Sequence, residues 1–258
     1  MTPFWKLHGI GNDFVFLSPG ATPTTDFIRQ ICSRTDGVGS DGLIVVNPSG
    51  ANEAQMQMWN PDGSESGMCG NGLRCAALWL NREVSHHHSW KIALGGGHYE
   101  VVQRDFSRFA VEMGRASVSG QPKSYWVGER ELLGFSVDVG NPHLVFFVEE
   151  DPTPLLPHGK ILEHHPDFPN RTNVHFARIT RDEIVMATWE RGAGPTRACG
   201  SGACAVASAA TVTQGTNSSL LVHLPGGDLL IEDADDTITM IGEASLVYFG
   251  NWPSATGR

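Results

Sequence analysis

The sequence of 258 residues has few cysteines, no long apolar run and no excess of basic residues. Its five cysteines are an odd number and few for this length, which argues against a scaffold held together by disulfides. Cys69 and Cys75 enclose five residues and Cys199 and Cys204 enclose four, and neither spacing is that of a usual zinc site. The run His86-His87-His88 follows a helical pattern in a polar loop, where solvation is expected. We therefore expect no metal site.

Membrane segments and targeting signals are also missing. The longest apolar runs, such as Leu144 to Val148, are far too short to cross a bilayer. Residues 1–14 contain no basic stretch followed by an apolar run, so we expect no signal peptide. A net charge of −10 without a basic cluster disfavours a nucleic acid or an anionic membrane as partner. These absences predict a soluble protein of the cytoplasm.

What the sequence does contain is a long internal repeat. Cys69 and Cys199 lie 130 positions apart, and so do Trp59 and Trp189. Other matches keep this register to within two positions: Gly11-Asn12 with Gly140-Asn141, Gly70 with Gly200, Gly72 with Gly202, and 113–117 with 241–245. A period of half the chain indicates two similar domains rather than a solenoid. We expect the first domain over residues 1–118, completed by a C-terminal strand in 245–258, and the second over 119–244.

Hydrophobic spacing gives a coarse order of helices and strands. Helices are predicted over these ranges, with strands between most of them: 25–34, 73–81, about 159–164, and 203–212. The second and fourth helices directly follow the glycine turns that contain Cys69 and Cys199. The Pro-rich segment 151–157 is predicted to be a loop, and the polar stretch 119–125 to be the domain boundary.

Cys69 and Cys199 each stand in a glycine turn before a predicted helix. The positive end of a helix dipole and its unpaired N–H groups favour a thiolate, so we expect pKa values between about 3.5 and 7.5 instead of about 8.5. The same N–H groups can hold a substrate carboxylate. Two opposed thiols suit proton exchange at one carbon, because one removes a proton while the other returns one to the opposite face. The pattern predicts racemisation or epimerisation without a cofactor, with the developing charge stabilised at the helix N-termini.

Together with their surroundings, the two cysteine motifs resemble those of diaminopimelate epimerases. The motifs that carry the resemblance run through both halves: His8-Gly9-Ile10-Gly11-Asn12-Asp13-Phe14, Asn60-x-Asp62-Gly63-Ser64-Glu65, Cys69-Gly70-Asn71-Gly72, Gly140-Asn141-Pro142-His143, Asn173, Glu190-Arg191-Gly192-Ala193-Gly194, Ala198-Cys199-Gly200-Ser201-Gly202, and Pro225-Gly226-Gly227. The resemblance implies an α/β (α+β) fold of two pseudo-symmetric, barrel-like domains, each wrapped around a central helix, with the active site in the cleft between them. It also implies that a homodimer interconverts LL- and meso-diaminopimelate in lysine and cell-wall synthesis, without metal, pyridoxal phosphate or ATP.

The resemblance also implies a role for each matched residue. Cys69 and Cys199 are the acid and the base, and they exchange roles with the direction of the reaction. His143 and Glu190 tune the thiols. The substrate-binding set combines side chains and backbone groups: Asn12, Asn60, Gly70, Asn71, Asn141, Asn173, Glu190, Arg191, Gly200 and Ser201. One departure is Gly42, where some members of the family have glutamine.

Two other functions stay open. A racemase of another amino acid would share the two-thiol chemistry, but a proline or histidine substrate would not need Arg191, Asn60 and Asn173 together. A protein that senses oxidation belongs to a different class, and it would use the ease with which two close thiolates form a disulfide. In an epimerase that disulfide is an inactivating by-product, so we expect activity only in reductant.

Overall fold

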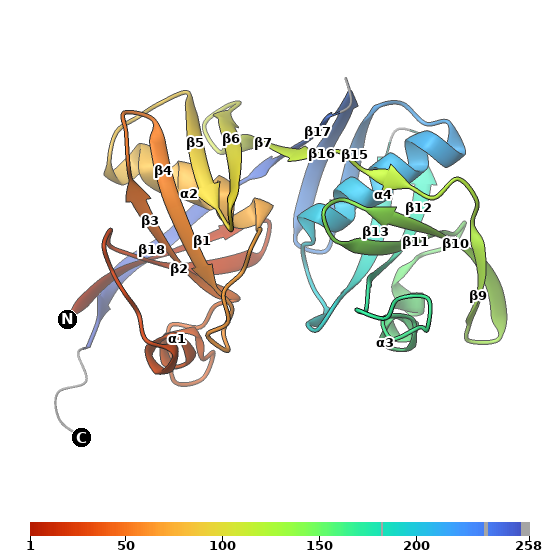
Figure 1. Cartoon of the computed structure of the whole chain (residues 1–258), viewed down its shortest axis with the longest axis horizontal. Helices are drawn as coiled ribbons and strands as arrows, with labels where there is room; N and C mark the ends of the chain where they lie inside the picture. The colour runs from red at the N-terminus through yellow and green to blue at the C-terminus, as the bar shows by residue number, and fades with distance from the viewer. Residues whose placement is uncertain (182, 235–236, 254–258) are drawn as a thin grey trace. The chain divides into compact units, whose positions relative to one another are not determined.

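The computed structural model describes residues 1–181, 183–234 and 237–253 (Figure 1). The chain forms two compact units. Unit 1 comprises Met1–Val111 together with the segment that begins at Gly242, and unit 2 comprises Glu112–Ile241.

Unit 1 combines a mixed sheet with two helices. Its strands are β1 (Thr2–Gly9), β2 (Asn12–Leu17), β3 (Gly42–Pro48), β4 (Glu53–Trp59), β5 (Ser89–Leu94), β6 (Gly97–Gln103), β7 (Arg108–Gly114) and β18 (Ser245–Trp252). Its helices are α1 (Thr25–Cys32) and α2 (Gly70–Glu83). The pairs β2–β3 and β4–β5 are parallel. Strand β18 pairs antiparallel with β1, so segments from opposite ends of the sequence lie side by side.

Unit 2 repeats this plan. Its strands are β8 (Ser117–Val118), β9 (Lys123–Val127), β10 (Arg130–Asp138), β11 (Pro142–Phe147), β12 (Asn173–Thr180), β13 (Glu183–Glu190), β14 (Gly194–Pro195), β15 (Ser219–Leu224), β16 (Gly227–Ala234) and β17 (Thr237–Glu243). Its helices are η1 (Thr153–His158), α3 (Gly159–Leu162) and α4 (Gly200–Gln214). The parallel pairs β11–β12 and β13–β15 match β2–β3 and β4–β5 of unit 1.

Each unit buries one helix. Residues 70–80 of α2 are buried, and α2 contacts β1, β3, β5, β6 and β18. In α4 the buried stretch reaches Ala210, and strands β8, β10, β11, β12, β13, β15 and β16 all contact it. A helix that is apolar or small-sided all round can be surrounded in this way. Consequently each glycine-flanked cysteine stands at the N-terminus of a buried helix.

The structure corrects one expectation about local structure. The segment 151–157, predicted to be a loop, forms most of the 3-10 helix η1, because a proline in a first turn lacks only an N–H that has no helical partner there. The polar stretch 119–125, predicted to be the domain boundary, leads into strand β9, which pairs with β10. The four predicted helices are present, and α2 and α4 begin three residues earlier than predicted.

One negative result concerns membranes. Across the described parts of the chain, no helix is long and apolar enough to cross a bilayer.

Candidate active site

Cys69 forms the N-cap of α2. Its backbone is extended (φ −153°, ψ 101°), and its Sγ accepts a hydrogen bond of 3.3 Å from the N–H of Gly72. Gly70 and Gly72 in the first turn leave this end of the helix without bulky side chains. Cys69 is half-buried. The thiol is therefore held at the helix N-terminus and still reachable.

An amide network lies beside Cys69. The Oδ1 of Asn12 accepts a hydrogen bond of 3.1 Å from Asn71 Nδ2 and lies 4.0 Å from Cys69 Sγ. The Oδ1 of Asn71 in turn accepts a hydrogen bond of 2.7 Å from the fully buried Arg74. The structure thus brings Asn12 and Asn71 together with Cys69. Arg74 was missed as a site residue, because in the sequence it reads as an ordinary residue in the first turn of the predicted helix.

A charged cluster fixes the other end of Asn12. Its Nδ2 donates a hydrogen bond of 2.9 Å to Asp41, which pairs with Arg34 at 2.6 Å. Arg34 and Lys6 also bond to Asp13; burial alone would raise the pKa of Asp13, but these partners outweigh it and lower the pKa to about 2. With its nitrogen held by a carboxylate, Asn12 presents its carbonyl oxygen to the thiol.

Asn60 is held inside its own turn after β4. Its Nδ2 donates a hydrogen bond of 3.0 Å to Ser64 Oγ, and its backbone N–H donates one of 2.8 Å to Ser64 O. Asp62 closes the same turn by accepting a hydrogen bond of 2.9 Å from the N–H of Ser64. The bond to Ser64 Oγ uses one of the two N–H groups of Nδ2, so Asn60 can bind a substrate through its amide without leaving Ser64.

Cys199 forms the N-cap of α4, as Cys69 does for α2. Its backbone is again extended (φ −122°, ψ 101°), but the residue is only 3% exposed. Its Sγ lies 3.8 Å from Ser201 Oγ. Gly200, directly after it, is buried, and Ser201 is half-buried.

The expected lowering of the thiol pKa is wrong for Cys199. Burial raises its pKa well above the ordinary value, and the negative charge of Glu190 adds to this; the contact with Ser201 acts in the opposite direction and is outweighed. Desolvation of a thiolate therefore exceeds the stabilisation that a helix N-terminus supplies. Cys199 is a protonated thiol at neutral pH in this structure.

A chain of hydrogen bonds links four side chains of unit 2. His143 Nε2 lies 2.9 Å from Asn141 Oδ1, and His143 Nδ1 lies 2.8 Å from His175 Nε2. His175 Nδ1 lies 3.1 Å from Thr188 Oγ1. Both imidazoles are fully buried. Burial, with the positive charge of Arg191, lowers the pKa of His143 to about 3; burial, with His143 beside it, lowers the pKa of His175 well below its ordinary value. Both rings are therefore neutral.

His175 and Thr188 were not among the predicted site residues. Each stands in a strand whose alternation does not mark it. The signal that would have identified them is the internal repeat, because the first half has apolar residues at the matching positions.

Asn173 joins the turn before β11 to the loop after β13. Its Nδ2 donates a hydrogen bond of 2.9 Å to Pro142 O, and its Oδ1 accepts one of 3.0 Å from the N–H of Arg191. The side chain of Arg191 is exposed and donates to Asn170 O at 3.3 Å. Glu190 accepts a hydrogen bond from the hydroxyl of Thr196. The structure thus uses Asn173 to position Arg191.

Glu163 is a fourth residue that the sequence did not mark, after Arg74, His175 and Thr188. It is 4% exposed, and it accepts hydrogen bonds of 2.8 Å from both the N–H of Gly192 and Nε1 of Trp189. Arg171 lies 3.4 Å from it. Burial would raise the pKa of Glu163, but the bonds from Trp189 and Gly192 prevail and lower it. The carboxylate therefore anchors the loop that carries Arg191.

Replacing Glu163 by glutamine is expected to lower the free energy of unfolding by about 1–3 kcal/mol, because an amide N–H₂ then faces buried N–H donors. The lowered pKa means that the stabilisation is present above its usual value near 4.5 and is lost as the pH falls below it. Urea unfolding at about pH 7, pH 5 and pH 3 measures both effects. Wild type should lose more stability than the variant on acidification. The control is Glu149→Gln, which changes an exposed glutamate. An equal decrease in the free energy of unfolding at about pH 7 in both variants, relative to wild type, would contradict the role of Glu163.

Within the described ranges, no three His, Cys, Asp or Glu residues are grouped so that they would hold a metal ion. His86 and His88 are exposed, and His87 packs edge-on against Trp90.

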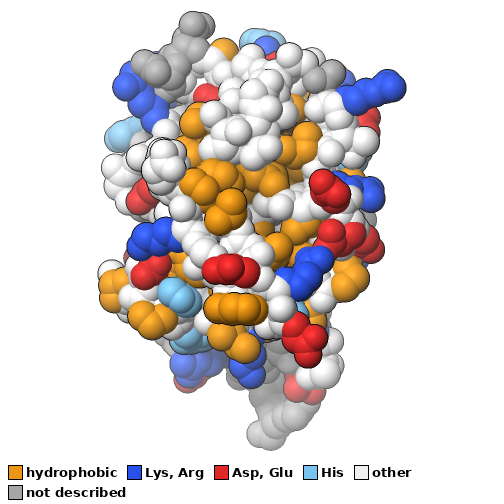
Figure 2. All heavy atoms as spheres, turned by 90° about the vertical axis from the view of Figure 1, so that its right-hand side faces the viewer, with side chains coloured by type: hydrophobic (Ala, Val, Ile, Leu, Met, Phe, Trp, Pro, Cys, Tyr) orange, Lys and Arg blue, Asp and Glu red, His pale blue; other side chains and the backbone are white. Residues whose placement is uncertain are grey.

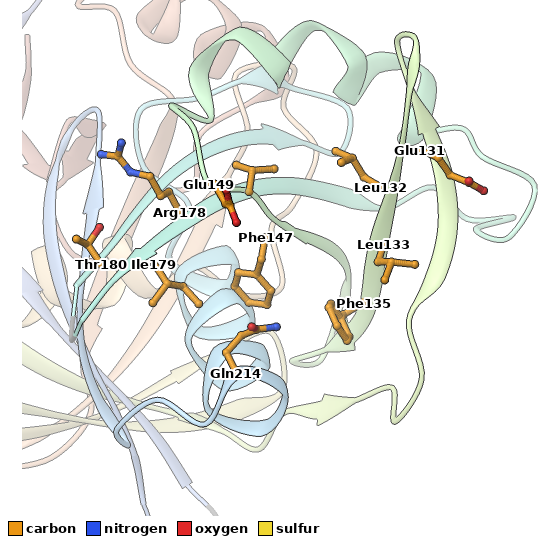
Figure 3. Close-up of a pocket in the computed structure, with 11 residues that line it drawn as sticks. Glu131, Leu132, Leu133, Phe135, Phe147, Glu149, Arg178, Ile179, Thr180 and Gln214 are labelled. Carbon is orange, nitrogen blue, oxygen red and sulfur yellow. The ribbon is translucent and has the colours of Figure 1, made fainter.

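Unit 2 also has a mostly apolar pocket of about 810 Å³ (Figure 3). It is formed by β10, the ends of β11 and β12 and the last turn of α4, with these lining residues: Glu131, Leu132, Leu133, Phe135, Phe147, Val148, Glu149, Arg178, Ile179, Thr180 and Gln214. None of the predicted site residues lines it. Hydrophobic side chains also gather in the middle of the face that Figure 2 shows.

Comparison with known proteins places these features in one family. The family model described as diaminopimelate epimerase matches residues 4–119 and 135–247. The protein named diaminopimelate epimerase in Desulforudis audaxviator is 40% identical over 276 residues, covering 98% of this chain and 99% of that protein. Its namesake in Moorella thermoacetica is 39% identical over 277 residues, covering 97% and 99%.

Solved structures show the same fold at low sequence identity. A PhzF-family phenazine biosynthesis protein from Bacillus anthracis has a TM-score of 0.76 at 14% identity, covering 96% of this chain and 98% of that chain. A hydroxyproline epimerase from Agrobacterium vitis has a TM-score of 0.72 at 15% identity, covering 96% and 91%. The predicted two-domain α/β fold is confirmed.

Proposed function

Because this chain belongs to the diaminopimelate epimerase family, we propose that Cys69 and Cys199 act together on one α-carbon of diaminopimelate. The observation that carries the proposal is that both cysteines are N-caps of buried helices, in matching turns of an internal repeat. Nothing about a packed core requires that arrangement twice. The activity is that of an isomerase of lysine biosynthesis, and its substrate is the LL or the meso isomer.

The reaction needs only two proton transfers. One thiolate takes the α-proton, and the electron pair of the broken C–H bond moves onto the α-carbon and its carboxylate. The other thiol then gives its proton to the opposite face, which inverts the carbon. The N–H groups of the two helix N-termini stabilise the carboxylate as its charge grows. Both thiols end in the opposite protonation state, so the reverse reaction exchanges their roles.

The two cysteines differ in burial, and in this proposal their first roles follow from that difference. Cys199 is buried beside Glu190 and holds its proton, so it acts as the acid in the first turnover. Cys69, which is more exposed, supplies the base. The α-ammonium group of bound diaminopimelate favours a thiolate beside it, because an opposite charge stabilises the charged form.

The remaining predicted residues bind the substrate or adjust the thiols in this proposal. Side chains hold the two ends of diaminopimelate, and backbone N–H groups hold the reacting carboxylate. The side-chain set is Asn12, Asn60, Asn141, Asn173 and Arg191, and the backbone set is Gly70, Asn71, Gly200 and Ser201. His143 and Glu190 set the polarity around the thiols. By the same resemblance we propose a cytoplasmic homodimer with functional domains over 1–118, completed by 245–258, and 119–244.

The test is deuterium incorporation at the α-carbon of LL-diaminopimelate in heavy water, with reductant and EDTA present. We expect label in both the LL and the meso isomer, and no activity after the two thiols are oxidised. Label from another amino acid but none from diaminopimelate would refute the substrate. Full activity after oxidation of both thiols would refute the mechanism.

A further inference from the structure

Three of the four side chains in the hydrogen-bonded series of unit 2, namely His143, His175 and Thr188, occupy positions that are apolar in unit 1. The parallel and antiparallel strand registers of the two units define the equivalent positions. The matched pairs are His143 with Phe14, His175 with Ile44, and Thr188 with Met58. All six residues are buried. The fold therefore forms with apolar residues at these three positions. The polar trio of His143, His175 and Thr188 must have a role that is specific to unit 2.

The atoms in contact define the direction of every hydrogen bond in the chain. Asn141 Oδ1 only accepts, so His143 carries its proton on Nε2. The ring is neutral, which leaves His143 Nδ1 to accept from His175 Nε2. His175 Nδ1 must then accept from the hydroxyl of Thr188. One donor, the Thr188 hydroxyl, thus sets the tautomer of both rings.

Asn141 stands at the end of this series of hydrogen bonds, and the bond from His143 determines which atoms of its amide remain free. Its oxygen is taken by His143, and no hydrogen bond among the described residues occupies its Nδ2. Asn12, its counterpart in unit 1, is held the other way round: its Nδ2 donates to Asp41, and its oxygen accepts from Asn71 Nδ2 and lies 4.0 Å from Cys69 Sγ. The two units therefore present opposite ends of equivalent amides: an acceptor in unit 1 and a donor in unit 2. A donor suits a carboxylate.

The chain also reaches the helix that carries the second thiol. A methyl group placed on Gly202 would lie 2.4 Å from His175 Cε1 and 3.0 Å from Cys199 Sγ. His175 therefore packs directly under the first turn of α4, next to the thiol. It does not approach a substrate, since it is fully buried between its neighbours.

We propose that Thr188 and His175 are positioning residues that fix the tautomer of His143 and turn the amide nitrogen of Asn141 toward a carboxylate of the substrate. This inference rests on the proposed function, in which Asn141 binds diaminopimelate. Reversing the chain would turn the oxygen of Asn141 toward that carboxylate and repel it.

The experiment compares Thr188→Val, which keeps the shape and removes the donor, with Thr188→Ser, which keeps the hydroxyl. Ser208→Ala is the matched control: it removes another buried hydroxyl of unit 2, which donates to Asp233 at 2.6 Å. Nitrogen-15 spectra of the histidines without substrate report the tautomers, and initial rates with LL-diaminopimelate report kcat and KM.

We expect wild type to show His143 and His175 as neutral Nε2–H tautomers. Thr188→Val should lose the uniform tautomer of His175 and raise KM about tenfold, with kcat changed less than about threefold. Thr188→Ser should restore both readouts, and Ser208→Ala should change neither. A proton on Nδ1 of either histidine in wild type would overturn the proposal, whether or not the valine variant folds. So would a folded Thr188→Val protein with unchanged tautomers and KM.

The spectra keep this inference separable from the proposed function. Wild type that shows the expected tautomers and their response to Thr188→Val, but does not epimerise diaminopimelate, would refute the proposed substrate and support the hydrogen-bond chain. Active wild type with Nδ1–H histidines would support diaminopimelate as the substrate and refute the proposed series of hydrogen bonds.

Discussion

Replacing either Cys69 or Cys199 by alanine will reduce kcat for epimerisation by about 10³-fold or more, because each variant loses one of the two groups that move the proton. Each variant keeps one thiol on one face of the α-carbon. Any exchange of the α-hydrogen that remains will therefore be confined to one isomer and will retain its configuration. Measuring isomer ratio and deuterium content in the same sample distinguishes exchange from inversion.

The chain supplies a matched control for each variant. Cys75 lies in α2 and Cys204 in α4, and both are fully buried. Burial raises the pKa of the Cys75 thiol far above its ordinary range, so it remains protonated and inert. Cys75→Ala and Cys204→Ala should lose some stability through a small cavity and keep kcat within about threefold. Epimerisation above a tenth of the wild-type rate in Cys69→Ala or Cys199→Ala would contradict the two-thiol mechanism.

Gly202→Ala is expected to have the second large effect. The new methyl group would lie 2.4 Å from His175 Cε1, 2.9 Å from its Nε2 and 3.0 Å from Cys199 Sγ. A buried ring held by hydrogen bonds on both sides cannot move aside easily. We expect a loss of about 2–3 kcal/mol in the free energy of unfolding and at least about a hundredfold loss in kcat/KM.

Gly72→Ala makes the same change at the matching position of unit 1. There the new methyl group meets the flexible tips of Met56 and Ile44 at 3.0 and 3.2 Å, and Cys69 Sγ at 3.4 Å. Alanine also gains up to about 1 kcal/mol over glycine in a helix, which offsets the crowding. Urea unfolding should therefore show a loss of less than about 1 kcal/mol. Equal destabilisation of the two variants would show that the His175 contact is not the cause.

Much of the fold could be predicted, because the repeat and the helix spacing are local or periodic signals. The position of each cysteine at a helix start follows from glycines that precede an apolar run. The raised pKa of Cys199 could not be predicted in this way, since it depends on burial by distant strands and on Glu190. A helix N-terminus is visible in the sequence, whereas the dielectric around it is not.

The supporting residues of the site were missed for a related reason. His175 and Thr188 meet only when β12 pairs with β13, and His143 joins them only when β11 lies beside β12. Glu163 reaches the Gly192 loop from a segment that reads as a short polar helix. Each of these contacts links positions far apart in the sequence. No local spacing marks them.

The same three buried positions hold polar residues in unit 2 and apolar residues in unit 1. This difference limits the order in which substitutions can convert one set into the other. Changing one member of the polar trio alone leaves a buried nitrogen or hydroxyl without its hydrogen-bond partner, which lowers the free energy of unfolding by about 1–3 kcal/mol. Changing all three together restores a set that the other half already tolerates. The effects of the three substitutions are therefore strongly epistatic, and the sign of one depends on the others. Stepwise evolution between the two halves has to cross intermediates that are less stable than either end.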